Sequence, residues 1–369
     1  MIRTSDPRLS VIVPAHNGAQ VLAEALPALR ASDLPHPRWE LIVVDDASTD
    51  DTAKVAERFA NTVIRLDGAP LGPAHARNCG TEAARADILV FVDADVCVHP
   101  DVLRKFLEVF TADPKVSAVF GAYDTEPRAP GLVSQYRNLL HHYVHASQAG
   151  EADTFWAGCG AIRRSAFLRA GLFDAKRYPR PRIEDIELGY RLRSLGCRIL
   201  LRPDIQATHL KRWTLRGMVQ NDVCDRGIPW MRLLLERGRL GEGTLNVRAE
   251  ERLLTGAAAL ALIALVLAPV AGSWVLVGVS GACVLLILVR NMTLIRWFAR
   301  VRGPWVALGV VPLRLLYYLL NAAVASMVLV QHLASRLVGN RSGKTASRNH
   351  DQQGVESVTT LPPSRGPEP

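Results

Sequence analysis

Two aspartates follow one of the most apolar short runs in the chain. Residues 86–98 read ADILVFVDADVCV, and the run Ile88–Val92 leads directly into Asp93-Ala94-Asp95. This pattern is typical of a fully buried strand with two carboxylates at its C-terminal end. Ligands of open α/β sheets bind beyond the carboxyl ends of strands, and carboxylates at i and i+2 can both reach a hard cation there. The sequence therefore predicts a divalent cation site, for Mg or Mn, at Asp93 and Asp95.

Two further acidic pairs occur at the ends of predicted elements. Asp45-Asp46 follows the apolar segment ELIVV, and Glu184-Asp185 stands at the start of a predicted helix. A divalent cation neutralises phosphates, so a diphosphate leaving group would suit the first site, with Arg77 available for charge-assisted contacts. A carboxylate that is not bound to the metal can act as general base on an attacking hydroxyl.

The elements that must position these groups alternate along the chain. Apolar and β-branched runs predict strands at residues 9–14, 40–44, 62–66, 88–92, 116–120 and 197–201, with helical spacing at residues 19–30, 52–60, 74–84, 100–111, 132–146 and 182–194. Such alternation indicates an α/β fold with a doubly wound, mainly parallel sheet, whose strand ends lie along one edge and form a cleft. No GxGxxG motif follows the first strand, which argues against a dinucleotide-binding dehydrogenase.

Five motifs occur in an order that resembles a known enzyme family. They are VIVPAHNGA, LIVVDDASTDDT, GPAHARNCG, DILVFVDADV and IEDIELGYRL, within a stretch of about residues 9–235. Together they resemble the family 2 inverting glycosyltransferases, which have a GT-A nucleotide-sugar-binding domain. The resemblance implies transfer of a sugar from a nucleotide diphosphate sugar in the presence of Mg or Mn.

The resemblance also implies a role for each motif residue. Asp185 would be the catalytic base with Glu184 beside it, Asp93 would hold the ribose and the metal, and Asp95 would be a second metal ligand. Arg77 would approach the base or the phosphates. The nucleoside pocket would be lined by Pro14, Ala15, His16, Asn17, Asp45 and Asp46, and the acceptor side by Trp156 and Gly158.

The segment His209-Leu210-Lys211-Arg212-Trp213 resembles the QxxRW motif of processive synthases in the same family. His209 replaces the glutamine, which argues against processive synthesis and leaves two roles open. His209 is either a ligand of the metal or diphosphate, or a structural histidine. Arg212 and Trp213 would lie on the acceptor side.

The C-terminal third is apolar. Residues 253–289 and 315–335 contain no Asp, Glu, Lys or Arg, which predicts membrane helices near residues 253–271, 274–289 and 315–335. The N-terminus lacks the features of a signal peptide, so the catalytic part is expected in the cytoplasm. The arginines of residues 290–314 then favour a hairpin of the first two membrane helices, because such a hairpin returns them to the cytoplasm. A third span would place the basic residues after 335 outside. The side of the tail stays open.

The basic excess fits a membrane partner. The net charge is +9, and much of the excess lies beside the apolar runs, which favours an anionic membrane surface over nucleic acid. The basic helical segment from residue 211 to about 252 is expected to lie against the bilayer. Six cysteines without metal-like spacing indicate reduced thiols, with no zinc and no disulfide expected.

The sequence thus predicts a glycosyltransferase domain at 1–235, a juxtamembrane segment at 236–252, a region of about three spans at 253–338 and a disordered tail at 339–369. The expected function is a membrane-anchored inverting glycosyltransferase that acts on a lipid-linked or membrane-proximal acceptor, at the plasma membrane. The alternatives are a processive polysaccharide synthase and a non-catalytic protein that binds nucleotide sugars.

Overall fold

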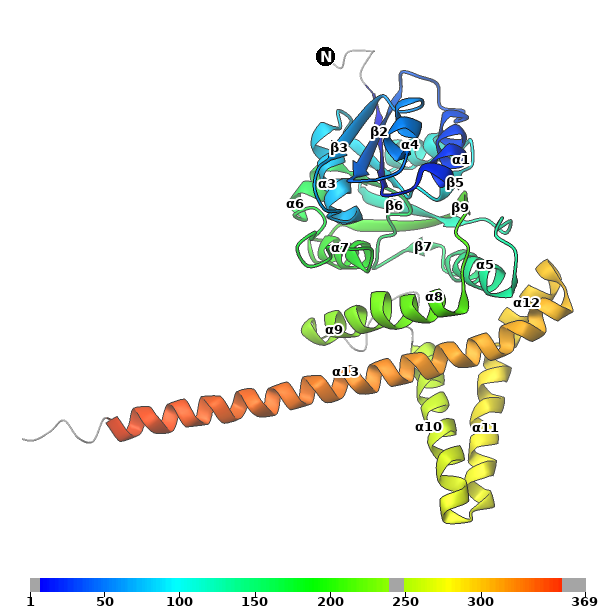
Figure 1. Cartoon of the computed structure of the whole chain (residues 1–369), viewed down its shortest axis with the longest axis vertical. Coiled ribbons are helices and arrows are strands. Elements are labelled where there is room, and N and C mark those ends of the chain that lie inside the picture. Colours follow the sequence, from blue (N-terminus) through cyan, green and yellow to red (C-terminus); the bar gives the residue numbers. More distant parts are fainter. Residues whose placement is uncertain (1–6, 239–248, 354–369) are drawn as a thin grey trace, which may run out of the picture.

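A sheet of nine strands forms the centre of the N-terminal unit in the computed structural model, which describes residues 7–238 and 249–353 (Figure 1). The order is β3 (Thr62–Leu66), β2 (Trp39–Asp46), β1 (Leu9–Ala15), β4 (Ile88–Val92), β8 (Cys159–Arg163), β6 (Val116–Tyr123), β9 (Arg198–His209) and β5 (Val96–Val98), with β7 (Gly150–Glu151) beside β9. The first four strands are parallel to one another, and so are β6 and β9. Strand β8 runs antiparallel between β4 and β6.

Helices cover both faces of this sheet. They are α1 (Ala19–Arg30), α2 (Thr52–Glu57), α3 (Pro73–Ala83), α4 (Val102–Ala112), α5 (Leu132–Ala146), α6 (Arg164–Arg169) and α7 (Glu184–Ser194). One core cluster joins α1 and α4 to one face through residues such as Leu26 and Phe106. The other joins α3 and α7 to the opposite face through residues such as Ala76 and Leu188. The doubly wound, mainly parallel arrangement predicted from the sequence is therefore confirmed.

The strand that precedes Asp93 is present as predicted. All residues of β4 are buried, and Asp93 follows its last residue directly. Two differences concern β5 and β9. Strand β5 has only three residues, too few for a periodic signal, whereas β9 continues through Pro203 to His209, beyond the predicted strand at 197–201. The pairing of β6 with β9 shifts register between Phe120 and Ala122, and this irregularity accommodates the proline.

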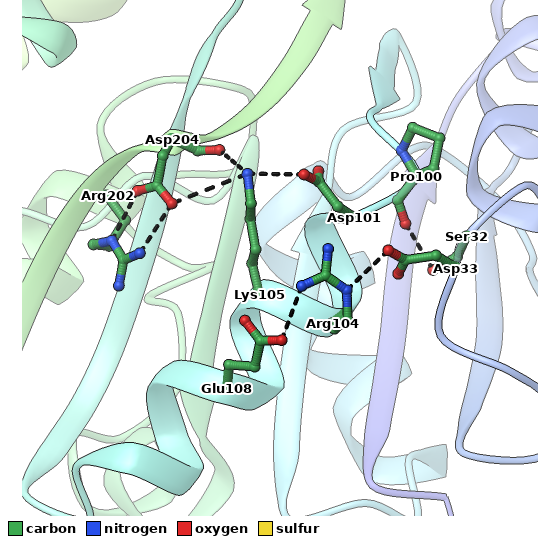
Figure 2. Close-up of polar contacts among 9 residues, drawn as sticks. All are labelled: Ser32, Asp33, Pro100, Asp101, Arg104, Lys105, Glu108, Arg202 and Asp204. Atoms are coloured by element: carbon green, nitrogen blue, oxygen red, sulfur yellow. Dashed lines mark hydrogen bonds and ion pairs between the residues drawn. The ribbon is translucent and has the colours of Figure 1, made fainter.

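Exposed ion pairs connect α4 to its neighbours (Figure 2). Arg104 Nε lies 2.9 Å from Asp33 Oδ2, in the α1–β2 loop, and Arg104 Nη1 lies 2.8 Å from Glu108. Lys105 Nζ lies 2.8 Å from Asp101 and also contacts Asp204 in β9. Because these side chains are exposed or partly exposed to water, each pair contributes about 1 kcal/mol or less. The network fixes loop positions on the side of α4.

The segment after β9 packs between two parts of the molecule, although many of its side chains stay exposed. It comprises α8 (Leu215–Gln220), a π-helical turn (Asn221–Gly227) and α9 (Ile228–Glu236), and it lies between the sheet domain and the last long helix (Figure 1). The prediction that residues 211–252 lie directly on a bilayer is therefore wrong for α9. Its apolar residues Leu233 and Leu234 are buried against Ile183 and Ile186 instead. Residues 239–248 lie outside the described residues.

The C-terminal helices form a hairpin and a crossing helix. Helices α10 (Ala249–Ala271) and α11 (Trp274–Arg290) pack side by side, and α12 (Met292–Arg302) follows at a bend of 53°. Helix α13 (Pro304–Gln353) crosses the hairpin at its end nearest the catalytic unit (Figure 1). Among the described residues, α10 and residues 304–336 of α13 are each long and apolar enough to cross a membrane, and α11 with α12 could form a third, bent span.

Helix α13 also changes the expectation for the tail. It continues to Gln353, so part of the predicted disordered range 339–369 is helical. The sequence has no proline between Pro312 and Pro362, and a proline is the strongest stop signal for a helix. Residues 354–369 lie outside the described residues.

Candidate active site

A cavity of about 1240 Å³ lies beyond the carboxyl ends of β1, β2 and β4 and extends to α10 and α13. Most of the residues that the sequence assigns to the site line it, namely Pro14, Ala15, His16, Asn17, Asp46, Arg77, Asp93, Asp95, Trp156, Glu184, Asp185, His209 and Trp213. Asp45, Gly158 and Arg212 are not among its lining residues. The structure thus brings all three acidic pairs to one edge of the sheet.

Arg77 connects two of the acidic positions. Its guanidinium projects from the second turn of α3, with Nη2 2.6 Å from Asp93 Oδ1 and Nη1 3.0 Å from Glu184 Oε1. The side chains of Arg77 and Glu184 are only 5% and 6% exposed. Burial disfavours the charged guanidinium, but Asp93 and Glu184 outweigh this effect and raise the pKa of Arg77. The two ion pairs, Asp93–Arg77 and Arg77–Glu184, hold Asp93 at a fixed distance from the start of α7.

Asp185 lies beside Glu184 in the first turn of α7. Burial, and then repulsion from Glu184, raise the pKa of Asp185 to about 6, against weaker opposing effects of Arg226, of the Ala157 N–H and of Arg77. The Ala157 N–H donates to Asp185 Oδ2 at 3.2 Å. A carboxylate with a pKa near neutrality is suited to accept a proton from a hydroxyl, because it is both ionised and sufficiently basic at working pH.

Helix α7 approaches the neighbouring loop closely enough to fix this carboxylate. A Cβ atom at Gly189 would lie 2.4 Å from the backbone nitrogen of Phe155. Only glycine permits this contact, which holds α7 against the segment that supplies the Ala157 N–H.

Asp95 and His209 form a pair that fits a cation. His209 Nε2 lies 3.4 Å from Asp95 Oδ2, and His209 Nδ1 lies 2.7 Å from Asn138 Oδ1. The Asn138 amide nitrogen donates to the Lys211 carbonyl, so Oδ1 is the atom that accepts from His209 Nδ1. In the neutral ring, Nε2 then presents its lone pair to a carboxylate, an arrangement that a cation between them would stabilise.

Protein groups alone do not complete a metal site. No cluster of three or more His, Cys, Asp or Glu side chains within residues 7–238 and 249–353 is arranged to hold a metal ion. Asp95 and His209 therefore supply at most part of a coordination shell. The remaining ligands would be water and phosphate oxygens, as Mg²⁺ usually has in phosphate-binding sites.

The carboxylates at the end of β2 have backbone partners. Asp46 accepts hydrogen bonds from the Leu71 N–H at 2.9 Å and the Gly72 N–H at 2.7 Å, and so holds the loop before α3. Asp45 Oδ1 accepts from the Ser48 N–H at 3.1 Å. Their contact with a nucleoside stays a prediction, and in the structure both carboxylates stabilise the loops around the pocket.

Gly158 acts through a neighbouring ring. A Cβ atom at this position would lie 2.6 Å from the indole of Trp156, so the glycine makes room for that side chain. The indole contacts Tyr123 edge-on, with ring centroids 4.8 Å apart, and Tyr123 stacks on His209 at 4.3 Å. Tyr123 was not identified from the sequence, because it lies at the end of a strand with no motif around it.

The histidines of α5 also belong to this aromatic wall. His141 lies 4.7 Å from the Trp156 ring, and His145 is buried, with Nδ1 3.0 Å from the Gly121 carbonyl oxygen. The sequence also predicts that His141, His142 and His145 belong to a polar or interfacial helix face rather than to a metal site, and the burial of His145 shows that it does not lie on an exposed polar face. Burial lowers its pKa to about 4. The available signal was the i, i+3, i+7 spacing of Asn138, His141 and His145, which places all three on one helix face.

Comparison with known proteins agrees with this geometry. Residues 10–170 match the profile of the family described as Glycosyl transferase family 2. A poly(ribitol-phosphate) beta-N-acetylglucosaminyltransferase, TarS of Staphylococcus aureus, is 34% identical over 101 residues, which are 26% of this chain and 18% of that protein. The putative teichuronic acid biosynthesis glycosyltransferase TuaG of Bacillus subtilis is 30% identical over 147 residues, 39% of this chain and 54% of that protein.

Two further comparisons cover more of the chain, one with a polysaccharide synthase and one with a solved structure. The poly-beta-1,6-N-acetyl-D-glucosamine synthase of Staphylococcus aureus is 27% identical over 228 residues, 58% of this chain and 53% of that protein. The mannosyltransferase PcManGT from Pyrobaculum calidifontis, solved in complex with GDP-Man and Mn2+, has a TM-score of 0.58 at 23% identity, covering 87% of this chain and 88% of that one. The chain spans about half or less of the length of these curated relatives.

The sheet topology is that of the GT-A fold, which the solved mannosyltransferase shares. Residues 10–170 therefore form a domain similar to the glycosyltransferases of family 2.

Proposed function

We propose that this chain is a membrane-anchored inverting glycosyltransferase that transfers a sugar from a nucleotide diphosphate sugar to an acceptor at the membrane. The observation that carries the proposal is the position of Asp185. Its carboxylate, with a pKa of about 6, lines the same cavity as Asp93 and Asp95, and that cavity reaches the apolar helices α10 and α13. The residue ranges 1–235 and 253–338 would be its catalytic and membrane regions.

In this proposal Asp185 removes the proton of an acceptor hydroxyl, whose oxygen attacks the anomeric carbon. The bond from that carbon to the donor diphosphate breaks, and the electron pair leaves with the nucleoside diphosphate. A divalent ion, Mg or Mn, would stabilise the charge that develops on the diphosphate. Asp93, Asp95 and His209 are the residues that would hold it. Arg77 fixes Asp93, so the donor site is organised before the substrate binds.

The decisive experiment replaces the base. Asp185→Asn should reduce turnover at least about 1000-fold, on the scale of lost general-base catalysis. Binding of the nucleoside diphosphate should change less than about twofold, because Asn keeps the size of the side chain and its contact with the Ala157 N–H. Released nucleoside diphosphate is measured across a set of nucleotide sugars, with and without Mn. Normal turnover of the variant would contradict the proposal, and Asp174→Asn, outside the cavity, is the matched control.

The membrane arrangement is a second part of the proposal. Helix α10 has 23 residues and α11 has 17, so they are about 34 and 26 Å long, close to the thickness of a hydrocarbon core. Trp274, 85% exposed, lies at the far tip of the hairpin, where an aromatic residue suits the membrane interface. We therefore propose that the hairpin spans the membrane while the catalytic domain stays in the cytoplasm.

Helix α13 has the residue distribution of a helix that lies along the membrane surface. Its polar residues Arg314, Tyr317 and Asn321 line the cavity, on the side of the catalytic domain. Trp305 and Leu308, 82% and 65% exposed, belong to a second, apolar face. Because α13 also crosses the hairpin (Figure 1), we propose an interfacial helix here in place of the third span predicted from the sequence.

A further inference from the structure

One guanidinium in the cavity has no counter-charge in contact with it. Arg226 extends from the π-helical turn and lines the cavity together with Asp185. Among the side chains of residues 7–238 and 249–336, none forms a hydrogen bond or an ion pair with Arg226, whose guanidinium lies 5.9 Å from the centre of the Trp230 ring. π-helical turns occur often at functional sites, where they redirect side chains.

A neighbouring acidic group is already used. Asp222, one turn earlier, pairs with Arg137, with Oδ1 2.6 Å from Nη2. Arg137 in turn repels Arg226, whereas Asp185 and Asp222 attract it without a direct contact. A half-buried arginine without a contacting anion has an uncompensated charge, so the site is electrostatically prepared for an anion. Planar guanidinium groups bind phosphate with two parallel hydrogen bonds.

The position of Arg226 indicates which substrate would bring that anion. The π-helical turn packs directly on α13, since a Cβ atom at Gly227 would lie 3.4 Å from the Val324 side chain. On α10 and α13 the cavity is lined both by small side chains, including Gly256, Ala259 and Ala325, and by polar ones such as Arg314 and Glu251, which pair with each other. The route from Arg226 therefore leads toward the apolar helices, away from the nucleoside side at Pro14–Asn17.

We propose that Arg226 binds the phosphate group of a lipid acceptor, whose apolar chain leaves the cavity between α10 and α13 while its hydroxyl reaches Asp185. The inference rests on the proposed glycosyltransferase function and names the acceptor class for the same site. Arg226 would hold the acceptor, and the groups at Asp93, Asp95 and His209 would hold the donor. The reacting bonds stay those described above.

A binding assay tests this without requiring turnover. Full-length protein in dodecyl maltoside micelles is titrated with dodecyl phosphate, with inorganic phosphate and with a nucleoside diphosphate in the presence of Mn. Arg226→Met should raise the Kd for dodecyl phosphate about tenfold and change the Kd for the nucleoside diphosphate less than twofold. Arg226→Lys should recover part of the affinity, since it keeps the charge but loses the bidentate geometry.

Matched variants separate the possible outcomes. Arg216→Met removes an exposed arginine of α8 that does not line the cavity, and it should bind all probes like the unmodified chain. Asp185→Asn should keep dodecyl phosphate binding even if no sugar is transferred, so failure of the catalytic proposal is distinguishable. Three results would each overturn the inference. They are unchanged dodecyl phosphate binding in Arg226→Met, an equal loss of nucleoside diphosphate binding, and inorganic phosphate binding as tightly as dodecyl phosphate.

Discussion

The guanidinium of Arg77 and the carboxylate of Glu184, 107 residues apart in the chain, form a buried ion pair at 3.0 Å. The same guanidinium binds Asp93, so α3, the end of β4 and the start of α7 are held together by one side chain. The contact explains why Glu184 precedes the proposed base. Glu184 positions Arg77 and raises the pKa of Asp185, and it need not contact a substrate for either role.

Loss of Arg77 should therefore destabilise the fold as well as the site. In Arg77→Met the nearly unexposed Glu184 carboxylate keeps its burial and loses its partner, a change that typically costs about 3–5 kcal/mol. Chemical denaturation measures the loss. Arg65→Met, which breaks the exposed pair with Glu57, is the control and should cost about 1 kcal/mol or less. Equal effects of the two variants would show that Arg77 has no special structural role.

The pH dependence of turnover follows from Asp185. A general base must be deprotonated, so kcat should fall as the pH decreases through about 6, the pKa of this carboxyl. An ordinary exposed aspartate would keep its activity down to a pH of about 4. Steady-state rates between pH 4.5 and 8, at saturating donor and acceptor, test this. A profile that stays flat through pH 6 would contradict the assignment of the base.

The raised pKa of Asp185 also makes the stability of the fold depend on pH. Low pH lowers the predicted turnover, but it favours the folded state. The native state binds the proton of Asp185 more tightly than the unfolded chain does, so its contribution is favourable at low pH and is lost as the pH rises from about 4 to about 6. At pH 7.5 the folded protein holds a buried charge. Asp185→Asn removes that charge, so the variant should melt at a higher temperature than the unmodified chain at pH 7.5, with a smaller difference at pH 4.5.

Much of this arrangement could be predicted from local sequence. The run Ile88–Val92 is uniformly apolar and is followed by Asp93, so both the strand and the acidic end were evident. Of the strand Arg198–His209 only the first part, 197–201, was predicted, because a proline rarely lies inside a strand and the register shift that accommodates Pro203 depends on the neighbouring strand β6.

The contacts between distant side chains could not be predicted. The pairing of Arg77 with Glu184 depends on how α3 and α7 pack on the sheet, and no periodicity encodes that distance. Arg226 was part of a basic segment expected at the bilayer surface. Its position inside the cavity follows from the packing of α9 and the π-helical turn against α13, which is a tertiary effect.

The close approach at Gly189 gives a prediction about α7. In Gly189→Ala the new methyl group would meet the backbone of Thr154 and Phe155 at 2.4–2.6 Å, so the helix must shift. We expect a loss of about 1–3 kcal/mol of stability, as for overpacking elsewhere, and a lower kcat because the Ala157 N–H and Asp185 move apart. Gly256→Ala is the control, because a Cβ atom at Gly256 has no neighbouring atom within 4 Å, and it should change stability by less than about 0.5 kcal/mol. Gly196 is not used, because its positive φ would strain an alanine. Normal stability and turnover of Gly189→Ala would show that α7 can relax.

The proposed membrane arrangement predicts the location of the chain after α13. If only α10 and α11 cross the bilayer, a reporter fused after Pro369 lies on the same side as the catalytic domain, whereas three spans would put it on the opposite side. Two fusions in a bacterial host decide this, one to a protein that fluoresces only in the cytoplasm and one to a phosphatase active only outside. The same reporters inserted at Gly272, at the tip of the hairpin, are the control and should give the opposite pattern. Phosphatase activity at the C-terminal fusion would mean that α13 spans the membrane, and Arg314 would then lie within the span together with its partner Glu251, 2.6 Å away.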